Sequence, residues 1–177
     1  MEEKREKSKV EEKKKKFIER TLVLLKPDAV ERGLTGEIIK RFEQRGLKII
    51  ALKMLKPTRE LVEKHYAPHK GKSFYPALVD YLCSGVVVAM IIEGVKAVEA
   101  VRKMVGPTDP LEAPMGTIRG DFSHVPMEYA DTLSMSLRNL VHASSSREEA
   151  EREIKIWFSP EEIQEYRRVE EVHIFGW

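Results

Sequence analysis

The chain has 177 residues, of which 42% are hydrophobic, so it is long enough to bury one core and we expect a single globular domain. Its longest apolar run, residues 86–92, is far shorter than the ~20 residues that span a bilayer, and we expect neither a membrane span nor a secretory signal. The single cysteine, Cys83, excludes an intramolecular disulfide framework and a cysteine-rich zinc site. We therefore expect a cytoplasmic protein without a bound transition metal.

The charge is concentrated at the N-terminus. Residues 1–20 hold nine Lys or Arg against six Glu, a net charge of +3, whereas the whole chain carries +2. We expect residues 1–17 to form a charged, flexible extension and residues 18–177 to form the single domain. The lysine run at residues 13–16 suggests a nucleic-acid contact as an alternative, but the interspersed glutamates argue against it.

The first half of the domain predicts a strand, a helix and a second strand. The aliphatic run at residues 21–25 predicts a buried strand that ends at Lys26-Pro27-Asp28. Apolar residues share one face over residues 35–44, which predicts a helix, and Gly46 follows where a left-handed cap is wanted. Partial alternation over residues 47–55 then predicts the second strand.

Two predicted helices, residues 59–66 and 75–83, precede a strongly β-branched third strand at residues 86–92. An amphipathic helix is predicted over residues 95–104. The following section, from Gly106 to beyond Gly116, is so rich in proline and glycine that we expect no regular element in it.

The fourth predicted strand is the short apolar run that carries His142. Ser146-Arg147-Glu148-Glu149 has the pattern of a capping box, and it opens a helix with Ala150 and Trp157 on one face. The order of elements predicts an α+β fold, a ferredoxin-like βαββαβ sandwich in which a four-stranded antiparallel sheet is covered by helices.

His142 is the first candidate for chemistry, because a strand and a capped helix would hold its imidazole at the mouth of a cleft. The alternative is a histidine that merely packs at a strand end. Phosphate loops are excluded: Gly71-Lys72-Ser73 lacks the required earlier glycine, since Tyr66 stands there, and no G-x-G-x-x-G occurs. If the protein handles nucleotides, side chains must bind the phosphates. The candidates are Lys26, Arg102, Thr108 and Arg119.

Each phosphate candidate has a plainer alternative. In the alternative, Arg102 is simply a solvated residue on the surface of its helix, and Lys26 simply ends an apolar strand. Arg119 lies in a loop between glycines, where a large cation has little structural work to do.

Several separate motifs, taken together and in order, resemble those of nucleoside diphosphate kinases. They are residues 21–30, the run Gly116-Thr117-Ile118-Arg119-Gly120-Asp121-Phe122, Asn139-Leu140-Val141-His142-Ala143-Ser144, residues 150–154 and Trp157-Phe158. The resemblance covers about residues 19–166 and leaves the charged extension outside.

This resemblance implies that His142 is phosphorylated, that Glu153 orients its imidazole with Ser144 nearby, and that Tyr66 lies beside it. The same resemblance implies phosphate contacts from Lys26, Arg102, Thr108 and Arg119, and sugar contacts from Lys26 and Asn139. It places Tyr75 on the base, with Val79 covering another part of that slot.

The reaction implied is ping-pong transfer of a γ-phosphoryl group between nucleoside tri- and diphosphates, with broad base tolerance because stacking rejects few bases. Mg²⁺ would be held on the nucleotide phosphates, with no metal ligands from the protein. The resemblance also implies a homo-hexamer, with a tetramer as the alternative.

Two features depart from the family pattern. Ser145 stands three residues after His142, where an aspartate is typical, so we expect activity with an altered metal dependence. Roughly ten extra residues lie within 123–137, and we expect a surface excursion there; His124 in it lacks a recognisable acid partner.

The competing functions are a noncatalytic interaction protein on the same fold and a phosphohistidine carrier that passes phosphate to protein.

Overall fold

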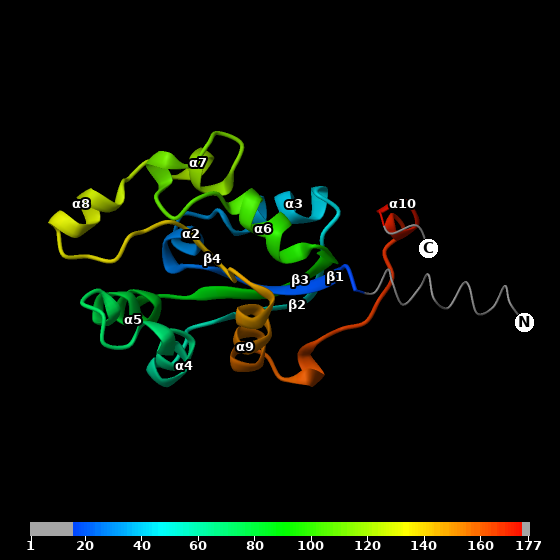
Figure 1. Ribbon diagram of the computed structural model, residues 1–177, viewed down its shortest axis with the longest axis horizontal. Coiled ribbons are helices and arrows are strands. Elements are labelled where there is room, and N and C mark those ends of the chain that lie inside the picture. The colour runs from blue at the N-terminus through cyan, green and yellow to red at the C-terminus, as the bar shows by residue number, and fades with distance from the viewer. Residues whose placement is uncertain (1–15, 175–177) are drawn as a thin grey trace, which may run out of the picture.

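The computed structural model describes residues 16–174, so most of the predicted extension and the last three residues of the predicted domain lie outside the described residues. Four antiparallel strands form one sheet in the order β2-β3-β1-β4 (Figure 1). The strands are β1 (Ile18–Leu25), β2 (Lys48–Leu55), β3 (Val87–Val95) and β4 (Val141–Ala143). This arrangement confirms the predicted α+β, ferredoxin-like class.

Helices cover both faces of the sheet (Figure 1). One layer holds α2 (Pro27–Glu31), α3 (Thr35–Gln44), α6 (Ala97–Val105) and α7 (Ile118–Phe122). The other holds α4 (Arg59–His65), α5 (Tyr75–Ser84) and α9 (Arg147–Trp157). The peripheral helices are α8 (Met127–Thr132) and α10 (Glu171–Ile174). None of the helices within residues 16–174 combines the length and the apolar character needed to cross a lipid bilayer.

Strand β1 is central because its side chains contribute to the hydrophobic cores on both faces of the sheet. Val23 and Leu25 pack with α3 and α6, whereas Leu22 and Leu24 pack with α4, α5 and α9, and all four are fully buried. Each such burial stabilises the fold by about 1.5–3 kcal/mol. This two-sided burial explains why the run predicted at residues 21–25 is continuously apolar rather than alternating.

The end of β1 is joined to β4, which brings residues far apart in sequence to one place. Leu24 pairs with His142, and the amide of Lys26 donates to the carbonyl of Leu140 at 2.8 Å. Leu140 is fully buried and has a φ of 70°, the left-handed region that a leucine seldom adopts. The carboxylate of Asp28 accepts a hydrogen bond from its amide at 3.1 Å and so supports this strained turn.

The structure corrects the predicted elements at three points. Lys26-Pro27-Asp28 does more than end β1, because Pro27 occupies the first position of the short helix α2. The proline-rich section, where we expected no regular element, contains a short 3-10 helix at Pro110–Glu112, and α7 follows it, capped by the Thr117 side chain. The extra segment at residues 123–137 contains α8, whose first amide, at Met127, donates to Asp109 at 2.9 Å.

Candidate active site

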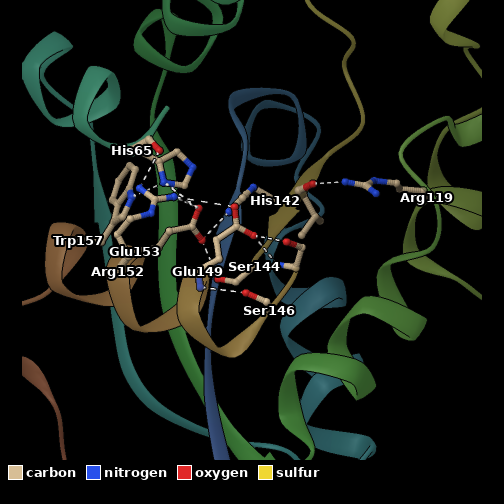
Figure 2. Close-up of polar contacts among 11 residues, drawn as sticks. His65, Arg119, His142, Ser144, Ser146, Glu149, Arg152, Glu153 and Trp157 are labelled. Carbon is tan, nitrogen blue, oxygen red and sulfur yellow. Dashed lines mark hydrogen bonds and ion pairs between the residues drawn. The ribbon is translucent and has the colours of Figure 1, made fainter. Parts of the chain in front are cut away.

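His142 lies at the centre of β4, the short edge strand beside β1, and its side chain is 19% exposed. Helix α9 begins after Ser146 and returns along the same end of the sheet, so its inner face meets the imidazole (Figure 2). The predicted placement of His142 between a buried strand and a capped helix is therefore correct.

Glu153 on α9 and Ser144 complete the surroundings of the imidazole. The Nε2 atom of His142 lies 2.9 Å from Oε2 of Glu153, and the Ser144 hydroxyl donates to the same oxygen at 2.6 Å (Figure 2). Glu153 is only 1% exposed, and this burial raises the pKa of its carboxyl group. A carboxylate on Nε2 leaves Nδ1 as the nitrogen with a free lone pair. Within residues 16–174, no hydrogen bond occupies Nδ1.

Burial lowers the pKa of His142 to about 3, with a further contribution from the positive charge of Lys26. The imidazole is therefore neutral at physiological pH. A neutral ring with one nitrogen held by a carboxylate and the other free has the features of a nucleophile.

His65, at the end of α4, contacts His142 in the structure and was not among the predicted site residues. Its ring meets that of His142 edge-on with centroids 4.5 Å apart, and its Nδ1 accepts a hydrogen bond from the Trp157 indole at 3.2 Å. His65 is 2% exposed, and burial lowers its pKa well below the usual value. A signal was available, because His65 shares the apolar face of α4 with Val62, three residues earlier.

One cluster in the part of the chain that the structure describes has metal-ligand chemistry: the ligand atoms of His65, His142 and Glu153 lie within 4.8 Å of one another. Two of these groups already form the His142–Glu153 contact, and Lys26 places a positive charge near His142. A second cation would meet this repulsion. We therefore interpret the cluster as a hydrogen-bonded network around the imidazole.

A group of cations lies on the other side of His142. The Lys26 ammonium is 7% exposed and donates to Oδ1 of Asn139 at 2.7 Å. Burial, followed by the charge of Arg119, lowers the pKa of Lys26 to about 8. Such a poorly solvated cation gains much from a phosphate oxygen.

The predicted loop position of Arg119 is wrong: Arg119 lies in α7, and its side chain is bound to the main chain, so it has a structural role that the sequence did not predict. Its guanidinium donates to four carbonyl groups, at 3.1, 2.9, 3.0 and 2.6 Å, which belong to Asn139, Gly106, Pro107 and Val141. Four of its five N–H groups are thus used, and one on Nη2 remains for an anion. Burial, then the charge of Arg102, lowers the pKa of Arg119 to about 10. Arg119 therefore holds the segment before α7 against β4 as well as adding charge.

The remaining predicted phosphate and sugar residues surround this group. Asn139 is 3% exposed and joins two segments, because its Nδ2 donates to the Thr108 carbonyl at 2.8 Å while its Oδ1 accepts from Lys26. Arg102 on α6 lines a hollow of about 490 Å³ together with Ser145. The structure thus gathers Lys26, Arg102, Thr108, Arg119 and Asn139 around the end of β4 that carries His142.

The predicted aromatic and base-binding residues have different surroundings. Tyr66 is 5% exposed and packs against His65, with ring centroids 4.6 Å apart. Tyr66 therefore contacts His65, which in turn contacts His142. Tyr75 opens α5 and lines a hollow with Lys64 and Lys70. Val79 is 1% exposed in the core beneath α5, so it offers a base almost no surface. The expected contribution of Val79 to the base slot therefore lacks structural support.

Comparison with known proteins agrees with this geometry. Residues 19–163 match the family model described as nucleoside diphosphate kinase. The curated nucleoside diphosphate kinase of Pyrococcus furiosus is 56% identical over 149 residues, which are 84% of this chain and 88% of that protein. That of Archaeoglobus fulgidus is 51% identical over 158 residues, 89% of this chain and 98% of that protein.

Solved structures show the same similarity. A transition-state mimic of the nucleoside-diphosphate kinase from Borrelia burgdorferi, with bound vanadate and ADP, has a TM-score of 0.87 and 38% identity, covering 90% of this chain and 98% of that one. A Halobacterium salinarum nucleoside diphosphate kinase in complex with CDP has a TM-score of 0.79 and 39% identity, covering 88% and 97%. The chain has the fold of these structures, and more than half of its aligned residues are identical to those of curated relatives. Together with the arrangement around His142 and the family match, this shows that the chain belongs to the nucleoside diphosphate kinase family.

Proposed function

We propose that the chain transfers the γ-phosphoryl group of a nucleoside triphosphate to a nucleoside diphosphate through a phosphohistidine on His142. Membership of the family makes the protein a nucleotide phosphotransferase, and the proposal assigns the steps to residues. The observation that carries it is the His142–Glu153 contact at 2.9 Å, which leaves Nδ1 free on a ring that lies near the charge of Lys26.

In the first half-reaction, the lone pair of Nδ1 attacks the γ-phosphorus. A nitrogen–phosphorus bond forms, the bond from phosphorus to the β,γ-bridging oxygen breaks, and the diphosphate leaves with that electron pair. The proton on Nε2 stays there, where Glu153 accepts its hydrogen bond and offsets the positive charge that develops on the ring. In the second half-reaction, a terminal oxygen of another nucleoside diphosphate attacks the same phosphorus. An oxygen–phosphorus bond forms, the nitrogen–phosphorus bond breaks, and its electron pair returns to Nδ1, which regenerates the neutral imidazole.

The cations supply most of the remaining stabilisation. We propose that Lys26, Arg102 and the free N–H of Arg119 contact phosphate oxygens, and that Asn139 and Lys26 contact the sugar hydroxyls. Both groups of Asn139 are engaged, one with Lys26 and one with the Thr108 carbonyl, so nucleotide binding must share or replace these contacts. We propose that Thr108, whose main-chain carbonyl accepts from Asn139, also contacts a phosphate oxygen.

We propose that Mg²⁺ enters this site bound to the nucleotide. The nearby carboxylates of Asp28 and Glu153 are already occupied, since Asp28 accepts from Tyr81 and Leu140 and Glu153 accepts from Ser144. Nucleotide phosphates would therefore supply most ligands of Mg²⁺, which neutralises phosphate charge when bound.

Broad base tolerance is part of the proposal. Tyr75 opens α5 at the edge of a hollow, and an aromatic face stacks on purines and pyrimidines alike. The related structures from B. burgdorferi and H. salinarum contain ADP and CDP, a purine and a pyrimidine nucleotide.

We further propose a cytoplasmic homo-oligomer, a hexamer or alternatively a tetramer, in which residues 18–177 form the single domain. Strand β2 lies at one edge of the sheet and exposes Leu52 and Met54, at 53% and 61%. An exposed apolar edge strand favours pairing with another chain. A cytoplasmic location is supported by the lone Cys83.

Phosphoryl transfer through His142 is tested by brief incubation with γ-labelled ATP and Mg²⁺, followed by a chase with GDP. The expected result is an acid-labile phosphoprotein that disappears as labelled GTP forms, and that is absent in His142→Ala. A folded His142→Ala variant that still accumulates label would contradict the assignment. Label that remains on the protein during the chase would instead support the phosphohistidine carrier.

A further inference from the structure

The N-terminal turn of α9 departs from the predicted capping box. As predicted, the Ser146 hydroxyl accepts a hydrogen bond from the amide of Glu149, at 3.1 Å. The returning half of a capping box would place the Glu149 carboxylate on the amide of Ser146. Instead, Oε2 of Glu149 accepts from the amide of Ser145 at 2.6 Å and from the Ser145 hydroxyl at 2.5 Å. The Glu149 carboxylate therefore binds Ser145, one residue nearer to His142 than the Ser146 amide that a capping box would use.

Helix α9 thus presents two carboxylates, one turn apart, to the two consecutive serines that follow the catalytic strand. Glu153 accepts from Ser144, and Glu149 accepts from Ser145. Arg152 lies beside both carboxylates, with its Nη2 atom 3.9 Å from Glu149 and 3.5 Å from Glu153. Figure 2 shows these side chains of α9 beside His142. The turn that connects His142 to α9 is held at two successive points by the same helix.

Electrostatics supports the same connection. The negative charge of Glu149 partly opposes the burial and the Lys26 charge that lower the pKa of His142. Burial by itself would raise the pKa of Glu149, but the two hydrogen bonds from Ser145 lower it, so the carboxylate is ionised at neutral pH.

We propose that Glu149 is a positioning residue for His142: its carboxylate holds Ser145 and so fixes the turn that aims the imidazole. This rests on the proposed function of His142. It also accounts for Ser145 at the position where the resemblance described above leads us to expect an aspartate, because the negative group at this turn comes from α9 instead of from the turn itself. Hydrogen bonds to an ionised acceptor are the strong ones, and two of them converge on one oxygen here.

The test compares Glu149→Ala with Glu149→Gln and with Glu151→Ala, an exposed glutamate on the same helix, by single-turnover phosphorylation of His142. Losing two hydrogen bonds to a carboxylate lowers the rate of Glu149→Ala about tenfold, while KM for ATP stays within about twofold. Glu149→Gln retains an acceptor oxygen and recovers to within about threefold of the wild type. Glu151→Ala matches the wild type.

A charge relocation completes the test. In Ser145→Asp/Glu149→Ala, a carboxylate returns to the same turn from its other side, and the rate rises at least about threefold above that of Glu149→Ala. Wild-type rates in Glu149→Ala, or a loss that neither the glutamine variant nor the relocated carboxylate repairs, would overturn the positioning role. If the wild type itself is not labelled at His142, the proposed function fails rather than this inference.

Discussion

The two sides of His142 are built differently. On the α9 side, the partners are side chains: Glu153 contacts the imidazole, and Ser144 donates to Glu153. On the cationic side, Arg119 donates four N–H groups to main-chain carbonyls and holds two loops together. We therefore expect changes on the first side to act mainly on the reaction, whereas the second side combines charge for the reaction with support for the structure.

The largest effect on activity is expected for Glu153→Ala. It removes the acceptor that holds the Nε2 proton and orients the ring, so kcat falls about 100-fold. The thermal midpoint falls less than in Arg119→Lys, because only the Ser144 hydroxyl and the His142 Nε2–H lose their acceptor, and removal of a desolvated carboxylate offsets part of that cost. Steady-state kinetics together with thermal unfolding checks both parts. A large loss of stability would show that the α9 side also carries the fold.

Arg119→Lys is expected to damage both properties. A lysine ammonium cannot reach four carbonyls in a fork, and each buried carbonyl left unpaired costs about 1–3 kcal/mol, so we expect the free energy of unfolding to fall by about 2–4 kcal/mol. Denaturant unfolding measures this change. The matched control is Arg102→Ala, which removes a nearby positive charge. It is expected to weaken nucleotide binding without a comparable loss of stability. Equal stability losses in both variants would erase the contrast.

Lys26 is expected to give opposite pH dependences for binding and stability. With its pKa near 8, the ammonium loses its proton as pH rises, and ADP affinity falls about tenfold by one unit above that pKa. The unfolded chain keeps this proton to higher pH and therefore binds more protons, so this group makes the free energy of unfolding rise between about pH 8 and 10.4.

Direct ADP titrations and denaturant unfolding across this range test both signs. Lys26→Arg retains its charge and should show a flat affinity profile. If wild-type affinity is equally flat, Lys26 does not act as a buried cation at the phosphates.

The smallest effect is expected for Ser145→Asp in the wild-type background. Two carboxylates would then share the turn that Glu149 now occupies alone, so activity persists but the Mg²⁺ concentration for half-maximal activity shifts about two- to threefold. Initial rates over a Mg²⁺ series measure the shift. An unchanged Mg²⁺ profile would contradict the expected altered metal dependence of the natural Ser145.

Residue patterns were sufficient to predict the frame of the site. The apolar run before Lys26, the helix N-cap at Ser146 and the short strand at His142 each depend on neighbours in sequence, and each appears in the structure, although the capping box predicted at Ser146 does not close there. The resemblance then supplied Glu153, whose place on the buried face of α9 with Ala150 and Trp157 agrees with helical spacing.

These sequence patterns could not predict which groups the buried side chains contact. His65 enters the site through contacts with Trp157, which is 92 positions away along the chain, and with His142. The resemblance assigned Val79 to a base slot, but the packing of α5 on the sheet buries it. Helical or strand periodicity identifies the buried face of an element but not the group that it meets.

The sequence by itself therefore determined the order of elements, the α+β class and the location of His142 at a strand end, because these follow from local patterns of polarity and capping. Only the tertiary structure decided that Arg119 clamps the main chain, that Lys26 is joined to Asn139, and that Glu149 closes on Ser145. Those contacts form where desolvated donors and acceptors must find partners in space, and a buried polar group is paired by geometry rather than by sequence distance.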